Sequence, residues 1–258
     1  MQQAIGRVPR ADVARALAVG AAMVGAAAGI AFTLAPDLDL AAARQFRLED
    51  GSFVGVHSGP ALFLRAMFKA IFIASCGAAI AGLLLVLLRR ATHWRMHAVT
   101  WLYLVLCLGV GPGLVTNTLL KDQWGRARPA QVVEFGGTKT FTPPLLPADQ
   151  CARNCSFVSG EAASMFAVFY SVALVLPQWS VPTIVAGTVV GLVAGLVRVA
   201  QGGHFLSDVV FAGVFMALTA AGLHRLVFSR SGAGATQRAM HGEAADNAAG
   251  STFTWRRR

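Results

Sequence analysis

Long uncharged runs, separated by short polar segments, dominate the pattern of this chain. Three runs contain no Asp, Glu, Lys or Arg and have about the 20 residues that a helix needs to cross a bilayer. They are residues 16–36, 70–88 and 98–120. Each of these runs predicts a transmembrane helix by itself.

The second half of the chain predicts three more helices. The uncharged run 162–197 is too long for one crossing, and Pro177 and Pro182 indicate a tight turn inside it, so it predicts two helices. Residues 209–223 form a shorter run, which we expect to begin within the polar residues before it. The pattern therefore predicts an all-α integral membrane protein with six transmembrane helices.

Composition agrees with this fold class. Of the 258 residues, 55% are hydrophobic and 13% are charged, which is too apolar for the surface of a soluble protein. The net charge of +10 raises the alternative of a nucleic-acid binder. The basic residues, however, stand between the apolar runs and not in one patch, so we expect a lipid bilayer as the partner and no nucleic acid.

The distribution of Lys and Arg predicts the orientation. The two terminal segments and the loop after the second helix hold 12 basic and 3 acidic residues, against 10 basic and 9 acidic in the other loops. By the positive-inside rule, the termini are cytoplasmic and the other loops face outward. We expect an uncleaved first helix and not a cleaved signal peptide, because its apolar run is too long for a signal core.

Domain organisation follows from the same pattern. Residues 1–228 are expected to form one transmembrane domain, and residues 229–258 a basic, disordered cytoplasmic tail without an apolar stripe. The sequence predicts no oligomeric state.

Three polar segments on the outward side contain the candidate chemistry. Lys121, Arg126, Arg128 and Arg198 are cations that could surround a phosphate, although any single one is more commonly a headgroup contact. Ser159 and Gly160 precede a helix, whose N-terminus favours anions. The alternative for these two residues is an ordinary helix cap.

His204 and Asp208 form the third group. They are four residues apart, so on a helix they share one face, where the carboxylate can orient the imidazole. One ring nitrogen would then be free to attack phosphorus. Gly202 and Gly203 leave room for a substrate beside them.

The spacing of these residues resembles the type 2 phosphatidic acid phosphatase superfamily of membrane lipid phosphatases. Lys121 is followed after six residues by Arg128 and a proline, as in the first family motif. Arg198, His204 and Asp208 match the third motif, with five and three residues between them. The resemblance covers residues 98–225.

The middle motif departs from the family pattern. The usual Pro-Ser-Gly-His appears here as Val158, Ser159, Gly160 and Glu161, and the serine that usually precedes the arginine of the third motif is Val197. The resemblance implies that the missing histidine would protonate the leaving oxygen. Glu161 is then an acid with a raised pKa, or a base that activates water, or a residue beside a leaving group that needs little help.

The resemblance also implies a reaction and its parts. His204 forms a phosphohistidine, Asp208 orients it, and Lys121, Arg128 and Arg198 stabilise the phosphoryl oxygens, with Arg126 as an additional candidate. No cofactor and no metal ion are implied. The tryptophan and arginine content of residues 124–128 resembles bacterial lipid A 1- and 4′-phosphatases. The site would face the periplasm from a bacterial inner membrane.

Several alternatives stay open. Phosphatases of undecaprenyl diphosphate or phosphatidylglycerophosphate share the three motifs, and a phosphotransferase would use the same intermediate. An anionic-lipid binder or a transporter would hold the anion without chemistry. Cys151 and Cys155 stand four apart in an outward loop, where a disulfide or two free thiols are the alternatives, while Cys76 and Cys107 lie within helices.

Overall fold

The computed structural model describes residues 10–89, 92 and 96–250, with side chains as far as residue 228. All of its named elements are helical. They are α1 (Arg10–Leu34), α2 (Asp37–Arg44), α3 (Gly59–Arg89), α4 (Ala98–Leu108), η1 (Gly109–Lys121), η2 (Pro129–Gln131), η3 (Val133–Phe135), α5 (Gly160–Val175), η4 (Pro177–Trp179), α6 (Ser180–Ala200) and α7 (Leu206–Gly250). The predicted all-α class is confirmed.

Five helical segments in the described part of the chain are long and apolar enough to cross a membrane. They are Ala11–Leu34, Gly59–Arg89, Ala98–Lys121, Pro177–Ala200 and Leu206–Phe228. The last begins within the polar residues before the apolar run, as predicted, so Asp208 lies in its first turn.

The remaining apolar helix, α5, is shorter than a full crossing. Its 16 residues correspond to about 24 Å of helix. Ten of them are buried, and α5 packs against α4, α6 and α7. It is therefore the central helix of the bundle, and the sixth crossing stays a prediction.

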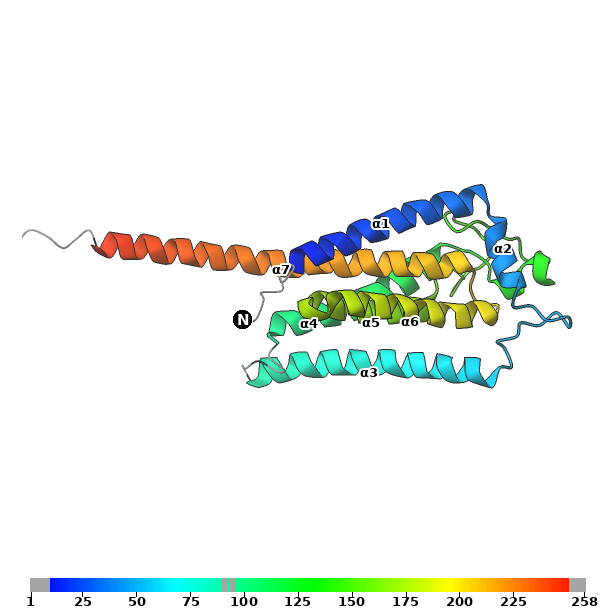
Figure 1. Ribbon diagram of the computed structural model, residues 1–258, viewed down its shortest axis with the longest axis horizontal. Coiled ribbons are helices and arrows are strands. Elements are labelled where there is room, and N and C mark those ends of the chain that lie inside the picture. The colour runs from blue at the N-terminus through cyan, green and yellow to red at the C-terminus, as the bar shows by residue number, and fades with distance from the viewer. Residues whose placement is uncertain (1–9, 90–91, 93–95, 251–258) are drawn as a thin grey trace, which may run out of the picture.

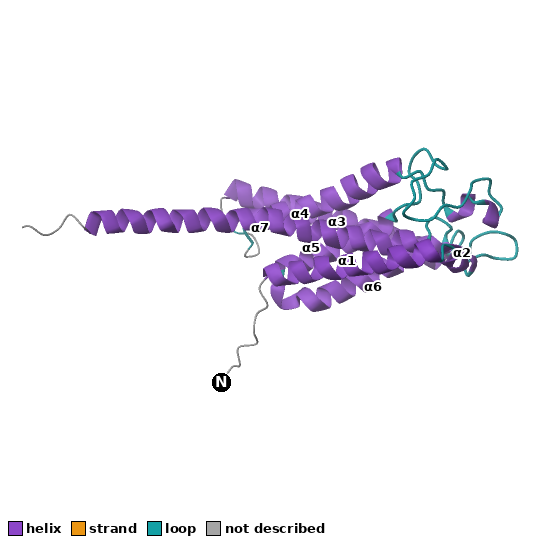
Figure 2. Ribbon diagram, turned by 90° about the horizontal axis from the view of Figure 1, so that it is seen from above, coloured by secondary structure: helices purple, strands orange, loops and turns teal. Residues whose placement is uncertain are grey.

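The bundle has two different ends. Figure 1 shows α1, α3, α5, α6 and α7 running roughly parallel, with α2 and most of the irregular chain gathered at one end. The view from above in Figure 2 places the same loops at that end, whereas α1 begins and α7 ends at the other. The described part of the chain therefore starts and finishes at the end opposite its long loops.

The third of these apolar segments, Ala98–Lys121, is not a uniform α-helix. From Gly109 to Lys121 the backbone follows the wider π-helical path, which contains Pro112. Glycine and proline weaken the regular hydrogen-bond ladder, and π-helical segments often occur at functional sites. The segment ends with the side chain of Lys121 buried at the loop end of the bundle.

The C-terminal segment differs from the prediction. We expected disorder from residue 229, but the backbone of α7 stays helical to Gly250. Alanine is frequent in this stretch and has the highest helix propensity, which outweighs the lack of an apolar stripe. Residues 251–258 of the predicted tail lie outside the described residues, as do Arg7, Arg90 and Arg95, which entered the count of basic residues.

A stripe of glycines brings α6 close to its neighbours. A Cβ atom on Gly187, Gly191 or Gly195 would lie within 2.5 Å of a side-chain atom of α5 or α7. At Gly191 that neighbour is the ring of Phe166, and at Gly195 it is Val209. Small residues at every fourth position allow helices to approach closely in a membrane. The stripe therefore determines where the end of α6, with Arg198, meets α7.

We predict that Gly191→Val destabilises the bundle by about 1–3 kcal/mol, because the added atoms overlap the Phe166 ring. The measurement is thermal unfolding of the purified protein in detergent. Gly77→Val is the matched control, since a Cβ at Gly77 in α3 meets nothing within 4 Å. Equal shifts in both variants would contradict the close approach of α5 and α6.

Candidate active site

Three segments that are far apart in the sequence meet at the loop end of the bundle. The backbone carbonyl of Ser156 lies 2.7 Å from the His204 ring. The guanidinium of Arg126 lies 2.6 Å from the carboxylate of Asp208. These contacts join residues 121–129, 156–161 and 198–208, so folding assembles one site from the segments that the sequence singled out.

His204 is buried and its two ring nitrogens have different surroundings. Since a carbonyl oxygen only accepts, Nδ1 donates its hydrogen to the Ser156 carbonyl, and Nε2 is left as the unprotonated nitrogen. Nε2 has no hydrogen-bond partner among the described residues. Burial lowers the pKa of His204 from its ordinary value, and the nearby Asp208 opposes this shift without reversing it. The ring is therefore a neutral imidazole with a free lone pair.

Asp208 orients His204 less directly than predicted. Its Oδ2 lies 3.6 Å from Nδ1 of His204, which is beyond hydrogen-bond distance. The same oxygen accepts hydrogen bonds from the Ser156 hydroxyl at 2.5 Å and from the Phe205 amide at 2.8 Å. Asp208 thus holds the Ser156 side chain and the Phe205 backbone, and the Ser156 carbonyl makes the direct bond to the ring.

The position of Arg126 differs from the one expected for a residue that binds phosphate. Its side chain is fully buried, and it donates to Asp208, Ser207 and Asp39 at distances of 2.6, 2.9 and 2.8 Å. A fourth bond goes to the Thr142 carbonyl. Because these bonds use four of its five N–H donors, Arg126 positions Asp208 and does not face a ligand.

Asp39 was not among the predicted site residues. It lies in α2, is fully buried, and accepts hydrogen bonds from the Ser207 amide and hydroxyl as well as from Arg126. Burial raises the pKa of Asp39, and the charge of Arg126 acts against that increase. In the sequence Asp39 looks like any acidic residue of an outward loop, and only its burial reveals the role.

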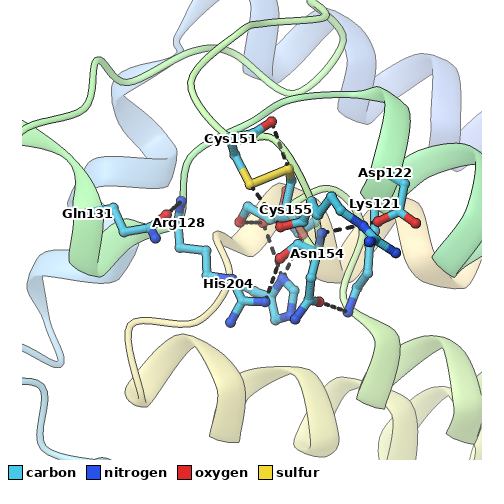
Figure 3. Close-up of a disulfide and its surroundings, with 11 residues drawn as sticks. Lys121, Asp122, Arg128, Gln131, Cys151, Asn154, Cys155 and His204 are labelled. Carbon is cyan, nitrogen blue, oxygen red and sulfur yellow. Dashed lines mark hydrogen bonds and ion pairs between the residues drawn. A yellow bond between two sulfur atoms is a disulfide. The ribbon is translucent and has the colours of Figure 1, made fainter.

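Two of the predicted phosphate-binding cations, Lys121 and Arg128, lie around one backbone turn. Arg128 donates to the Asn154 carbonyl at 2.6 Å, and the Lys121 ammonium lies 3.5 Å from the side-chain oxygen of Asn154. Figure 3 shows this arrangement beside the disulfide that joins Cys151 and Cys155. The disulfide closes a small ring that contains Asn154, so it holds the residue on which both cations converge.

The start of α5 also lies beside Lys121. Ser159 is the residue before the helix, and its hydroxyl is buried without a partner among the described residues. A Cβ atom on Gly160 would lie 2.9 Å from the Lys121 ammonium. Glycine thus lets a cation approach the end of a helix that itself favours anions.

Glu161, in the first turn of α5, contacts two cations from other helices. Its Oε1 lies 3.1 Å from Nε of Arg65 in α3 and 3.3 Å from Nε of Arg198 in α6. Two guanidinium groups at this distance favour the ionised carboxylate. Arg198 also donates to Gln201, and a Cβ on Gly203 would overlap its guanidinium. Sequence reasoning missed Arg65, because it follows an ordinary outward loop.

A protein-family model matches residues 100–231, more than half of the chain, and its description is the PAP2 superfamily. The chain belongs to the PAP2 superfamily. This confirms the resemblance to the type 2 phosphatidic acid phosphatases, and the matched residues include all three PAP2 motif segments.

Individual relatives give a narrower comparison. The chain is 41% identical to a lipid A 4′-phosphatase of Francisella tularensis subsp. novicida over 129 residues, which are 50% of this chain and 58% of that protein. It is 41% identical to a lipid A 4′-phosphatase of Rhizobium etli over 103 residues, 39% of each chain. It is 36% identical to a lipid A 1-phosphatase of the same species over 124 residues, 46% of this chain and 47% of the relative.

These matches span part of each protein. The chain covers between about two fifths and three fifths of the length of these curated relatives. No solved structure gives a significant match. The site geometry described above therefore has no related solved structure beside it for comparison.

We predict that Asp39→Ala lowers the stability of this PAP2 domain by about 3–5 kcal/mol, since it leaves Arg126 in a buried ion pair with one partner missing. Thermal unfolding in detergent measures the change. Asp37→Ala is the control, because Asp37 is exposed on the same helix. A loss no larger than that of the control would contradict the role of Asp39 as a buried anchor.

Proposed function

We propose that this protein is a membrane lipid phosphatase that removes a phosphate from lipid A by way of a phosphohistidine. The observation that carries the proposal is the free Nε2 of His204. The charges of Lys121 and Glu161 lie close enough to act on the same ring. A buried nucleophile beside cations can support phosphoryl transfer through a covalent intermediate.

The reaction proceeds in two displacements. The lone pair of His204 Nε2 attacks phosphorus, the bond from phosphorus to the lipid oxygen breaks, and that oxygen leaves with the electron pair. Lys121, Arg128 and Arg198 stabilise the charge on the remaining phosphoryl oxygens. Water then attacks the phosphohistidine, the P–N bond breaks, inorganic phosphate leaves and Nε2 regains its lone pair.

Glu161 acts in the second displacement. Because Arg65 and Arg198 favour its ionised form, it has no proton to give to the leaving lipid oxygen. A carboxylate can accept a proton from the water that attacks the phosphohistidine. The first displacement then favours a leaving oxygen of low basicity, as in a glycosyl 1-phosphate or a diphosphate.

The curated relatives support lipid A as the substrate. Their names place a phosphate at position 1 and another at position 4′ of lipid A. We propose one of these two phosphates as the one removed, and the low basicity of a glycosyl oxygen favours position 1. The 41% identity to two lipid A 4′-phosphatases, over part of the chain, supports the 4′ position.

The membrane arrangement belongs to the same proposal. Six crossings, with α5 as the short one, bring both chain ends to the cytoplasmic side of a bacterial inner membrane. The long loops and the site then face the periplasm. The common end at which α1 begins and α7 ends supports an even number of crossings.

We predict that His204→Ala lowers phosphate release by at least about 10³-fold, because the nucleophile is lost. The measurement is phosphate release in detergent with EDTA, from lipid A, phosphatidylglycerophosphate, phosphatidic acid and undecaprenyl diphosphate. His57→Ala, in an exposed loop, is the control and should keep the wild-type rate.

The same panel separates the alternatives. If the protein released phosphate only from undecaprenyl diphosphate or only from phosphatidylglycerophosphate, that lipid would replace lipid A as the proposed substrate. Release only with an added lipid acceptor would indicate a phosphotransferase. Binding of a lipid without turnover in the wild type would contradict the phosphatase proposal.

We predict that Glu161→Gln slows the second displacement about 10²-fold or more, because the water loses its base. Rapid mixing and quenching should then find phosphorylated protein accumulating in the variant. The phosphoryl bond should be acid-labile, as expected for phosphohistidine. Full activity of the variant across the pH range would exclude proton transfer by Glu161.

A further inference from the structure

A second pair of cations lies on α3, outside the three PAP2 motifs. Arg65 and Lys69 are one helical turn apart and therefore share a face. Between Gly59 and Leu88 they are the only charged residues of the sequence. Two cations within this otherwise uncharged stretch of a membrane helix call for a partner.

These two side chains line a cavity between α3, η1 and α5. Its volume is about 600 Å³, enough for a sugar phosphate headgroup. The polar residues that line it are Arg65, Lys69, Asn117, Lys121, Glu161 and Ser164. Lys121 and Glu161 also belong to the candidate active site, so the cavity is continuous with it.

The cavity has an excess of positive charge. Three cations line it, and Glu161 is the only carboxylate among its described lining residues. Arg65 and Arg198 share that carboxylate, with one contact each to Oε1. Lys69 makes no ion pair or hydrogen bond within the described residues. One or two negative charges of a ligand are needed to balance the cavity.

The position along the helix matches a lipid headgroup. The uncharged run 70–88 corresponds to about 28 Å of helix, close to the thickness of the hydrocarbon core. Lys69 then stands at the outward boundary of the core and Arg65 one turn beyond it. Basic residues on the outward side run against the positive-inside rule, which indicates a local function.

We infer that Arg65 and Lys69 form a second phosphate-binding subsite, which holds a phosphate of the substrate that is not cleaved. This inference rests on the proposed function and narrows it to lipids with two phosphate groups. One phosphate lies among Lys121, Arg128 and Arg198, next to His204, while the other lies in the cavity against α3. Substrates with both groups are thereby preferred.

The test compares two lipids with Lys69→Gln. Phosphate release is measured from bis-phosphorylated and mono-phosphorylated lipid A with the same acyl chains, in detergent free of phospholipid. The ratio of kcat/KM for the two lipids should fall about tenfold in Lys69→Gln, mainly through KM, because one charge-assisted bond is lost. Lys69→Arg should restore most of the ratio.

Arg89→Gln is the matched control. It removes a cation from the same helix at the opposite end, where Arg89 is exposed, and should leave the ratio and the activity unchanged. A fall of equal size for both lipids in Lys69→Gln, or none, would overturn the subsite. If Lys69→Gln lost only a stimulation by added phosphatidylglycerol, the phosphate bound would be that of a neighbouring lipid, which also overturns the inference as stated.

A binding experiment separates this inference from the proposed function. His204→Ala protein is titrated with both lipids, and then His204→Ala/Lys69→Gln protein. Loss of preference for the bis-phosphorylated lipid in the double variant supports the subsite even if the wild type releases no phosphate. Equal affinities for the two lipids in the His204→Ala protein would reject the subsite, whatever the activity.

Discussion

The guanidinium of Arg126 is the charge on which the site depends. It is fully buried, and removing an unpaired cation from water would be prohibitive. Asp39 from α2 and Asp208 from α7 lie on either side of it at 2.8 and 2.6 Å. The ring of Phe205 covers it at 4.4 Å. Because both carboxylates must reach this one cation, the short helix α2 and the apolar helix α7 have to meet at a defined place.

The position of His204 depends on this contact. Asp208, once held by Arg126, binds the Ser156 hydroxyl and the Phe205 amide, and Ser156 in turn accepts the His204 Nδ1 hydrogen. The ring is therefore held through its neighbours on both sides. The chain of bonds leaves Nε2 without a partner among the described residues, so the network that stabilises the fold also leaves this buried nitrogen free of a hydrogen bond.

The reacting side of the network has the opposite character. Lys121, Arg128 and Arg198 keep donors available, and Glu161 balances only part of their charge. Charge is thus balanced around Arg126, whereas positive charge is in excess around Lys121, Arg128 and Arg198, which is the arrangement that the proposed phosphate binding requires. The glycine stripe of α6 supports this arrangement, since it allows the helix that ends with Arg198 to pack directly on α5 and α7.

The sequence by itself determined the helical class, five of the crossings and the residues of the three motifs. Apolar runs and motif spacings are local properties, and they follow from the order of residues alone. Tertiary structure decided which charges meet. Asp39 and Arg65 lie in segments without a motif, and α7 stays helical where the pattern predicted none. Arg126 is fully buried between two carboxylates, whereas Arg128, two residues later, is only partly buried and binds a backbone carbonyl. The partner of a buried charge is chosen by packing between distant segments, and no local pattern encodes that choice.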